Sequence, residues 1–301
     1  MTRTADPLRR STRVLRLWDW SVPPAAVHRE VLSVVPDGWA DLPRGERKPP
    51  LLFVHGLGHG AWCWDEHWLA AAAERGYPAY AVSLRGHGGS GGSKKLGRTL
   101  MRDYVHDVLQ TVTELLEPPV LVGHSMGGLV SQLVADRYPV RGLVLLTPAP
   151  AHGALPTMLA TLPKRPLDVT AMLVGRTMPM RPDTLFVGLD RSTAERYVGR
   201  TGRESPLVQY EFLRRRRIGP VRAPVLVVGA TEDEIIRVVD IERTARMYGV
   251  DPVMLDGIGH DVMLDEGWDR ALDLVLDWVD AEVPAGTPPL GPLVEPAEAG
   301  R

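Results

Sequence analysis

One serine lies in a setting that is typical of a catalytic nucleophile. Gly123-His124-Ser125-Met126-Gly127 has the pattern G-x-S-x-G, between an apolar run at 120–122 and a helical composition at 129–134. The nearby glycines permit the strained turn that such a strand–turn–helix needs. We therefore expect Ser125 to be the nucleophile and the Met126 N–H to be one oxyanion donor. The alternative is a glycine-rich turn with an exposed, inert serine.

A serine hydroxyl is a weak nucleophile at neutral pH and needs a base. The run Gly257-Ile258-Gly259-His260-Asp261 follows a predicted strand at 253–255. A histidine in a loop with flanking glycine, at the carboxyl end of a strand, can reach a crevice. We therefore predict that His260 is the general base, with a surface-loop histidine as the alternative.

The base in turn needs a carboxylate to orient it and to stabilise its positive charge. Glu232, Asp233 and Glu234 follow the predicted strand at 225–228. We favour Asp233, because it heads the run Asp-Glu-Ile-Ile where the turn should re-enter the fold. Glu232 is the second choice and Glu234 the third. The resulting chain order, Ser, Asp, His, matches one known arrangement of such triads.

The second oxyanion donor should come from the loop after the strand at 51–54. That loop reads His55-Gly56-Leu57-Gly58-His59-Gly60, and its small residues allow the backbone to approach a substrate. We predict the Leu57 N–H as this donor and a hydrogen-bonding role for His55. His59 and His124 are candidates for the substrate pocket, and a structural role for His59 is an equal alternative.

The elements that must position these residues alternate along the chain. Strands are predicted at 51–54, 78–84, 120–122, 143–146, 225–228 and 253–255, after a first strand at 27–35; helices are predicted at 64–75, 99–116, 127–137, 239–248 and 268–283. Strands separated by helices imply an α/β fold, with a mostly parallel central sheet and helices on both faces.

Residues 149–219 interrupt this alternation. They are rich in Leu, Met, Pro and Arg, and candidate helices lie at 167–174, 192–198 and 206–217. An insertion at the carboxyl ends of parallel strands lies over the active-site crevice, so we expect a helical cap; a separate interaction domain is the alternative. The core then comprises 27–148 and 220–283. We expect the Pro-, Gly-, Ala- and Glu-rich tail at 284–301 to be disordered.

The composition is that of a globular protein with no preference for polyanions. The 301 residues carry a formal net charge of −2, which gives no global field toward nucleic acid. We interpret the basic run 214–217 as a solvated helix face, with a patch for anions as the alternative. The single cysteine, Cys63, has apolar neighbours and is expected to be a buried, inert thiol.

The sequence also bears on cofactors, membrane segments and secretion. No cluster of His, Cys and Asp has zinc spacing, and the glycine-rich run 86–92 lacks the ending of a phosphate loop, so we expect neither metal nor cofactor. No stretch of about 18 apolar residues or secretory signal is visible. We therefore expect a cytoplasmic protein with a small-molecule substrate; its oligomeric state is left open.

Taken together, these motifs resemble the α/β-hydrolase fold family from about residue 51 to 283. The matching pieces are His55-Gly56, the run 84–90, the run 123–128, Gly229 to Asp233, and Gly259-His260. The stretch 55–64 is similar to the branch that holds small-molecule esterases and hydroxynitrile lyases. Two features depart from the family: Ser83 stands where an Asp is common, and the usual length of the acid's turn would nominate Glu232.

The resemblance implies a serine hydrolase that cleaves a carboxylic ester, lactone or thioester through an acyl-enzyme on Ser125. The same fold hosts acyltransferases, lyases, cofactor-free haloperoxidases, biosynthetic cyclases and ligand-binding proteins, and these remain alternatives. Some apolar residues of the cap should face the crevice, which favours a moderately hydrophobic substrate. These candidates are Met158, Leu159, Met172, Leu173, Met178, Met180, Leu185 and Phe186.

Overall fold

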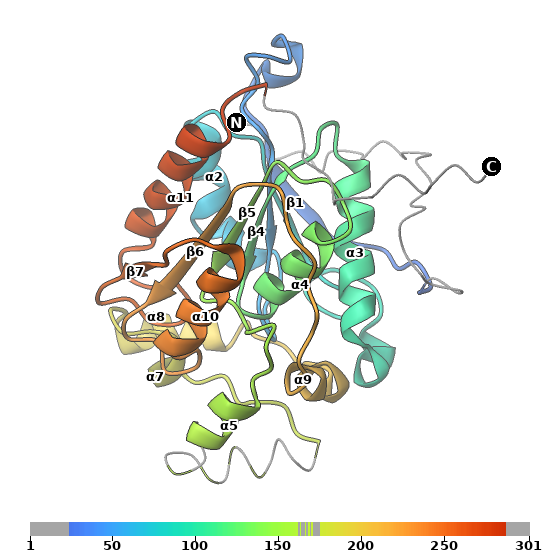
Figure 1. Ribbon diagram of the computed structural model, residues 1–301. Coiled ribbons are helices and arrows are strands. Elements are labelled where there is room, and N and C mark those ends of the chain that lie inside the picture. The colour runs from blue at the N-terminus through green and yellow to red at the C-terminus, as the bar shows by residue number, and fades with distance from the viewer. Residues whose placement is uncertain are drawn as a thin grey trace, which may run out of the picture.

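The computed structural model describes residues 24–286, except 162, 164, 165, 167, 169 and 171–174 (Figure 1). Its centre is a seven-stranded sheet in the order β1-β3-β2-β4-β5-β6-β7. Strand β1 pairs antiparallel with β3, and the other neighbours pair in parallel. The mostly parallel sheet is thus confirmed. The strands are β1 (Val31–Val34), β2 (Leu51–Val54), β3 (Ala79–Val82), β4 (Val120–His124), β5 (Gly142–Leu146), β6 (Val225–Ala230) and β7 (Val253–Leu255).

Helices cover both faces of this sheet, as the alternation predicts. One face carries α1 (Trp62–Asp65), α2 (Trp68–Glu74) and α11 (Trp268–Glu282). The other carries α3 (Met101–Glu114), α4 (Met126–Ala135) and α10 (Val238–Tyr248). Short 3-10 helices span Trp39–Asp41 and Ser93–Arg98. The predicted helix at 64–75 is interrupted, because α1 ends at Asp65 and α2 begins at Trp68.

Strand β2 shows why the central strands read as continuous apolar runs. All four of its residues are buried. Leu51 and Phe53 point into the core under α2 and α11, whereas Leu52 and Val54 point into the core under α3 and α4. Both faces of the strand therefore require apolar side chains.

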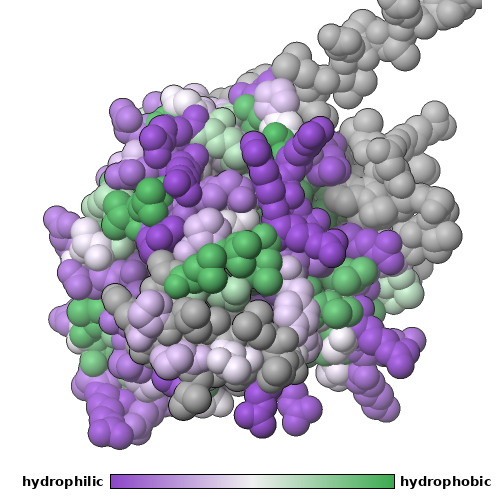
Figure 2. All heavy atoms as spheres, turned by 60° about the horizontal axis from the view of Figure 1, so that its bottom comes forward, coloured by the Kyte–Doolittle hydropathy of each residue, from purple (hydrophilic) through white to green (hydrophobic). Residues whose placement is uncertain are grey.

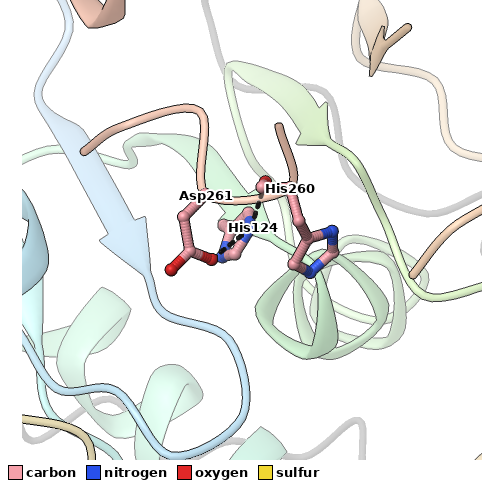
Figure 3. Close-up of side chains that lie close together, drawn as sticks. All are labelled: His124, His260 and Asp261. Atoms are coloured by element: carbon pink, nitrogen blue, oxygen red, sulfur yellow. Dashed lines mark hydrogen bonds and ion pairs between the residues drawn. The ribbon is translucent and has the colours of Figure 1, made fainter. Parts of the chain in front are cut away.

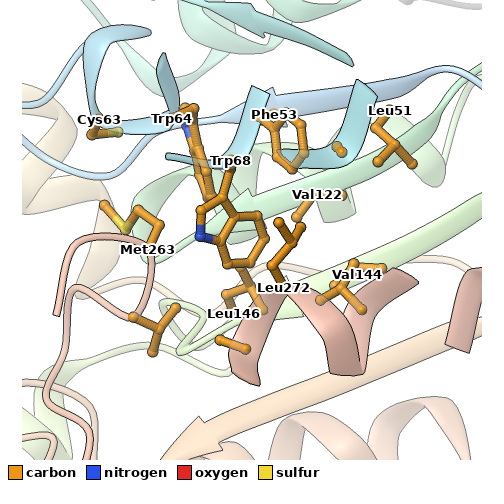
Figure 4. Close-up of a cluster of buried hydrophobic side chains, with 14 of the residues drawn as sticks. Leu51, Phe53, Cys63, Trp64, Trp68, Val122, Val144, Leu146, Met263 and Leu272 are labelled. Atoms are coloured by element: carbon orange, nitrogen blue, oxygen red, sulfur yellow. The ribbon is translucent and has the colours of Figure 1, made fainter. Parts of the chain in front are cut away.

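Aromatic packing anchors the segment that follows β2. The ring of Phe53 stacks on Trp64 at a centroid distance of 4.9 Å and meets Trp68 edge-on at 5.8 Å (Figure 4). Cys63 is buried in this cluster, and burial raises the pKa of its thiol well above the ordinary value. Cys63 is therefore a core residue, as its apolar neighbours indicate.

The segment between β5 and β6 adds four described helices near the carboxyl ends of the parallel strands (Figure 1). They are α5 (Leu155–Thr161), α7 (Pro182–Leu185), α8 (Arg191–Val198) and α9 (Pro206–Phe212). Figure 2 views this side, where hydrophobic side chains gather near the centre among hydrophilic ones. Most of the predicted helix 167–174 lies outside the described residues, as do residues 287–301 of the tail.

The basic run 214–217 is not a helix face, because α9 ends at Phe212. Three of the four arginines are exposed, and Arg216 pairs with Glu211 at 2.7 Å. The run is therefore solvated, but on irregular backbone. None of the helices in the described part of the chain combines the length and the apolar character needed to cross a bilayer.

Candidate active site

Ser125 sits in a strained turn between β4 and α4. Its φ of 51° and ψ of −117° are unusual for a residue with a side chain. The flanking glycines make the turn possible, because a Cβ on Gly127 would lie 2.2 Å from the Val54 carbonyl oxygen and one on Gly123 would lie 2.5 Å from the Gly127 carbonyl oxygen. The turn places Ser125 next to the amino terminus of α4, where the N–H of Met126, the first residue of the helix, has no carbonyl acceptor within the helix.

His260 and Asp233 form a hydrogen-bonded pair. Nδ1 of His260 donates to Oδ2 of Asp233 at 2.8 Å. The other Asp233 oxygen accepts the N–H groups of Ile235, at 2.7 Å, and Ile236, at 2.9 Å. Among the three acids considered for this role, Asp233 thus contacts His260. Glu232 and Glu234 are exposed.

Burial and Asp233 act in opposite directions on the His260 imidazole. Burial lowers the pKa of His260, but the charge and the hydrogen bond of Asp233 outweigh it, so the pKa lies above the ordinary 6.5. Because Nδ1 carries the proton that Asp233 accepts, Nε2 of the neutral ring is free to accept a proton. This is the arrangement that a general base requires.

Ser125 and His260 line the same small cavity, together with Leu57. A larger cavity begins at Ser125 and Leu57 and runs under the inserted helices. Its wall is mainly apolar, and its apolar lining residues are Leu57, Ala149, Pro150, Ala154, Met158, Met178, Pro179, Phe212, Leu213, Ile235 and Ile236.

The apolar residues predicted to face the crevice divide into several groups. Met158 and Met178 line the larger cavity, and Met178, Met180 and Leu185 line the smaller one. Leu159 is 56 % exposed, and Phe186 is buried in the core. Met172 and Leu173 lie outside the described residues.

His55 holds the loop after β2 in place. Its Nδ1 donates to the Gly56 carbonyl at 2.8 Å, and its Nε2 accepts the Leu84 N–H at 3.0 Å. Burial, followed by repulsion from His87, keeps the pKa of His55 well below its ordinary value, so the ring is neutral. The N–H and C=O of one peptide point in opposite directions. With the Gly56 carbonyl directed at His55, the Leu57 N–H points away from His55.

His124 is buried beside the site. Its Nε2 donates to the His260 carbonyl at 3.0 Å and lies 3.6 Å from Oδ1 of Asp261 (Figure 3). Burial, reinforced by repulsion from His260, lowers its pKa to about 3, so the ring is neutral. His124 borders the smaller cavity, but its ring is tied to the loop of His260.

The other histidine predicted for the pocket, His59, also borders the smaller cavity. Its ring binds the main chain of its own loop and the carboxylate of Asp261. Asp261 is not among the site residues predicted from the sequence. A carboxylate directly after the predicted base was the signal that could have identified it.

The ligand atoms of His124, His260 and Asp261 lie within 4.8 Å of one another, a spacing that could suit a metal ion. One nitrogen of each of these two rings already has a protein partner. Nδ1 of His260 is bonded to Asp233, and Nε2 of His124 is bonded to the His260 carbonyl. Hydrogen bonds thus account for how this cluster is held together.

Comparisons with known proteins place this chain in a family. A family model described as "Alpha/beta hydrolase family" matches residues 51–277. The chain is 36 % identical over 131 residues to the carbendazim hydrolyzing esterase of a Nocardioides strain, covering 41 % of this chain and 52 % of that protein. It is 36 % identical over 116 residues to Methylesterase 10 of Arabidopsis thaliana, covering 36 % of this chain and 40 % of that protein. The matches therefore span about half of these relatives or less.

Solved structures extend the likeness over most of the chain. A thermophilic esterase from Thermogutta terrifontis has a TM-score of 0.64 at 19 % identity, covering 87 % of this chain and 97 % of that one. A monoacylglycerol lipase from Paleococcus ferrophilus has a TM-score of 0.60 at 20 % identity, covering 86 % and 100 %. At these identities the likeness concerns the fold. With the family model matching most of the described residues, the chain belongs to the alpha/beta hydrolase family.

Proposed function

We propose that this protein is a serine hydrolase that cleaves a carboxylic ester, lactone or thioester of a moderately hydrophobic small molecule. One observation carries the proposal: a strained Ser125 shares a cavity with His260, whose imidazole is bonded to Asp233. The names of the relatives, an esterase and a methylesterase, support the same class of reaction.

In the acylation step, Ser125 Oγ attacks the substrate carbonyl carbon while Nε2 of His260 takes the hydroxyl proton. The carbonyl oxygen becomes an oxyanion, which the N–H groups of Leu57 and Met126 stabilise. Asp233 keeps His260 in the required tautomer and stabilises its positive charge. When the tetrahedral intermediate collapses, the bond to the leaving alcohol or thiol breaks, and His260 returns the proton to that group.

In the deacylation step, a water molecule gives a proton to His260 and attacks the acyl carbon. The second tetrahedral intermediate releases the carboxylic acid, and Ser125 recovers its proton from His260. The larger cavity supports the proposed substrate class, because its mainly apolar wall favours an apolar acyl or alcohol group. Methionines in that wall can adapt to different shapes.

The proposal is tested by incubating the wild type and Ser125→Ala with a panel of p-nitrophenyl esters, lactones and acyl thioesters of increasing chain length. Product analysis by mass spectrometry should show free acid from the wild type and none above background from the variant. Formation of a transferred acyl product or of an elimination product would instead support an acyltransferase or a lyase. Equal hydrolysis by both proteins would rule out the role of Ser125.

A further inference from the structure

A second histidine–aspartate pair lies buried beside the proposed triad. Nε2 of His59 is 3.0 Å from Oδ2 of Asp261, and the two side chains are 2 % and 0 % exposed. His59 belongs to the loop after β2, and Asp261 follows His260 directly. The proposed mechanism uses neither residue.

The contacts of His59 require protons on both ring nitrogens. Nδ1 lies 2.8 Å from the Leu57 carbonyl oxygen, and Nε2 faces the Asp261 carboxylate. Both partners can only accept when the carboxylate is ionised, so the ring is an imidazolium paired with a carboxylate. Trp62 stacks on this ring at 5.5 Å, which favours a cation. Burial lowers the pKa of His59, but Asp261 and the Leu57 carbonyl together raise it above the ordinary value.

The His59–Asp261 pair is bonded to the Leu57–Gly58 peptide, which directly follows the proposed oxyanion donor, the Leu57 N–H. His59 binds the Leu57 carbonyl, and the Gly58 N–H of the same peptide donates to Oε2 of Glu204 at 3.3 Å. Glu204 is itself buried and accepts from the Tyr104 hydroxyl at 2.5 Å. The Leu57–Gly58 peptide is thus held from both sides.

Main-chain hydrogen bonds to α7 and within its own loop fix Asp261. Its N–H donates to the Leu185 carbonyl at 3.0 Å, and its carbonyl accepts the N–H of Leu264 at 2.9 Å. The salt bridge to His59 therefore joins two loops that are separated by 202 residues in sequence. One of these loops carries His260, and the other carries Leu57.

We propose that His59 and Asp261 are positioning residues, a charged pair that keeps the Leu57 N–H in register with Ser125 and His260. This inference rests on the proposed function, because it assigns the Leu57 N–H to the oxyanion hole. Misplacing an oxyanion donor weakens a contact that strengthens in the transition state. Loss of the pair should therefore lower kcat and leave KM nearly unchanged.

The charge state is tested without any substrate. In protein labelled with ¹⁵N-histidine, long-range ¹H–¹⁵N correlation spectra recorded over a range of pH should show both ring nitrogens of His59 protonated up to a pH above 6.5, with His59→Asn supplying the assignment. In Asp261→Asn the ring should lose one of these protons. A His59 ring that is already singly protonated below pH 6.5 in the wild type would overturn the charged pair.

The coupling of the two loops is tested with Asp261→Asn, His59→Asn and the double variant. The matched control is Glu117→Gln, which removes another buried carboxylate, paired with Arg141 at 2.6 Å. Each single variant should reduce kcat and the rate of Ser125 labelling by a fluorophosphonate on the order of 10-fold or more. KM should change little, and the double variant should be no slower than the slower single variant. The control should retain wild-type rates.

Wild-type labelling and kcat in a folded Asp261→Asn variant would overturn the proposal. Hydrogen exchange at the Gly58 amide gives a reading that needs no catalysis: it should be faster in Asp261→Asn than in the wild type and in the control. If the wild-type Ser125 resists the fluorophosphonate, the proposed function fails. The imidazole spectrum and the Gly58 exchange then still decide whether the charged pair exists and holds the loop.

Discussion

One oxygen of the Asp233 carboxylate contacts His260 at 2.8 Å, and the other accepts two main-chain N–H groups. The carboxylate is therefore oriented before any substrate arrives, and so is the imidazole that it binds. A base that is already in place needs no reorganisation during the reaction, which is how preorganised sites lower a barrier. The main chain at 235–236 thus contributes to the proposed catalysis through Asp233.

Asp233→Asn should lower kcat by about 10³- to 10⁴-fold, because an amide that keeps its main-chain bonds favours the wrong tautomer of His260. The matched control is Glu232→Gln, since Glu232 is exposed and adjacent in sequence. Steady-state kinetics on a p-nitrophenyl ester measure both variants. A larger loss in Glu232→Gln than in Asp233→Asn would transfer the role of the acid to Glu232.

The pH dependence of kcat/KM should show an acidic limb. His260 accepts a proton only when neutral, and its pKa lies above 6.5 because Asp233 outweighs the effect of burial. Activity should therefore fall as the pH drops through a value above 6.5. Asp261 and His124 also face this ring. In Asp233→Asn the acidic fall in kcat/KM should occur at lower pH. If its position does not change, Asp233 does not affect the pKa of the group that titrates.

Gly127→Ala should destabilise the fold. The added Cβ would lie 2.2 Å from the Val54 carbonyl oxygen, which is buried main chain and cannot rotate away. We expect a loss of about 3 kcal/mol in the free energy of unfolding, measured by urea denaturation. Gly45→Ala is the control, because nothing lies within 4 Å of its added Cβ. Equal stability of the two variants would contradict the close packing at Ser125.

Ala154→Leu should shift the substrate preference toward shorter chains. Ala154 lines the larger cavity, and three more carbons there would narrow it. The ratio of kcat/KM for an octanoyl ester to that for an acetyl ester should fall by about tenfold. Leu159→Ala serves as the control, because Leu159 is 56 % exposed and lies outside that wall. An unchanged ratio in Ala154→Leu would place the acyl chain elsewhere.

Periodicity and glycine placement predicted much of this fold, because buried parallel strands leave a strong signal. The apolar runs at β2, β4, β5 and β6 appear in the sequence as short uninterrupted blocks. The inserted segment was harder to predict, since its short helices depend on contacts with the core. The composition at Arg214 and its neighbours suggests a helix, but α9 ends before them, because contacts with the core decide where these short helices end.

At the site, local sequence was sufficient for the turn at Ser125, whose close packing leaves no room for a Cβ on the flanking glycines. The position of Asp233, where the turn re-enters the fold, favours it among the three adjacent acids. Its carboxylate accepts two main-chain N–H groups of that turn. The partnership of His59 with Asp261 could not be read from sequence, because it joins two loops 202 positions apart. Only the folded sheet brings these loops together.

The most direct measurement of the central claim is the intact mass of the protein after treatment with a fluorophosphonate, for the wild type and for Ser125→Ala. We expect a single adduct on the wild type and none on the variant, because only an activated serine reacts. A folded wild type that gains no adduct, or a variant that gains the same adduct, would contradict the assignment of Ser125 as the nucleophile.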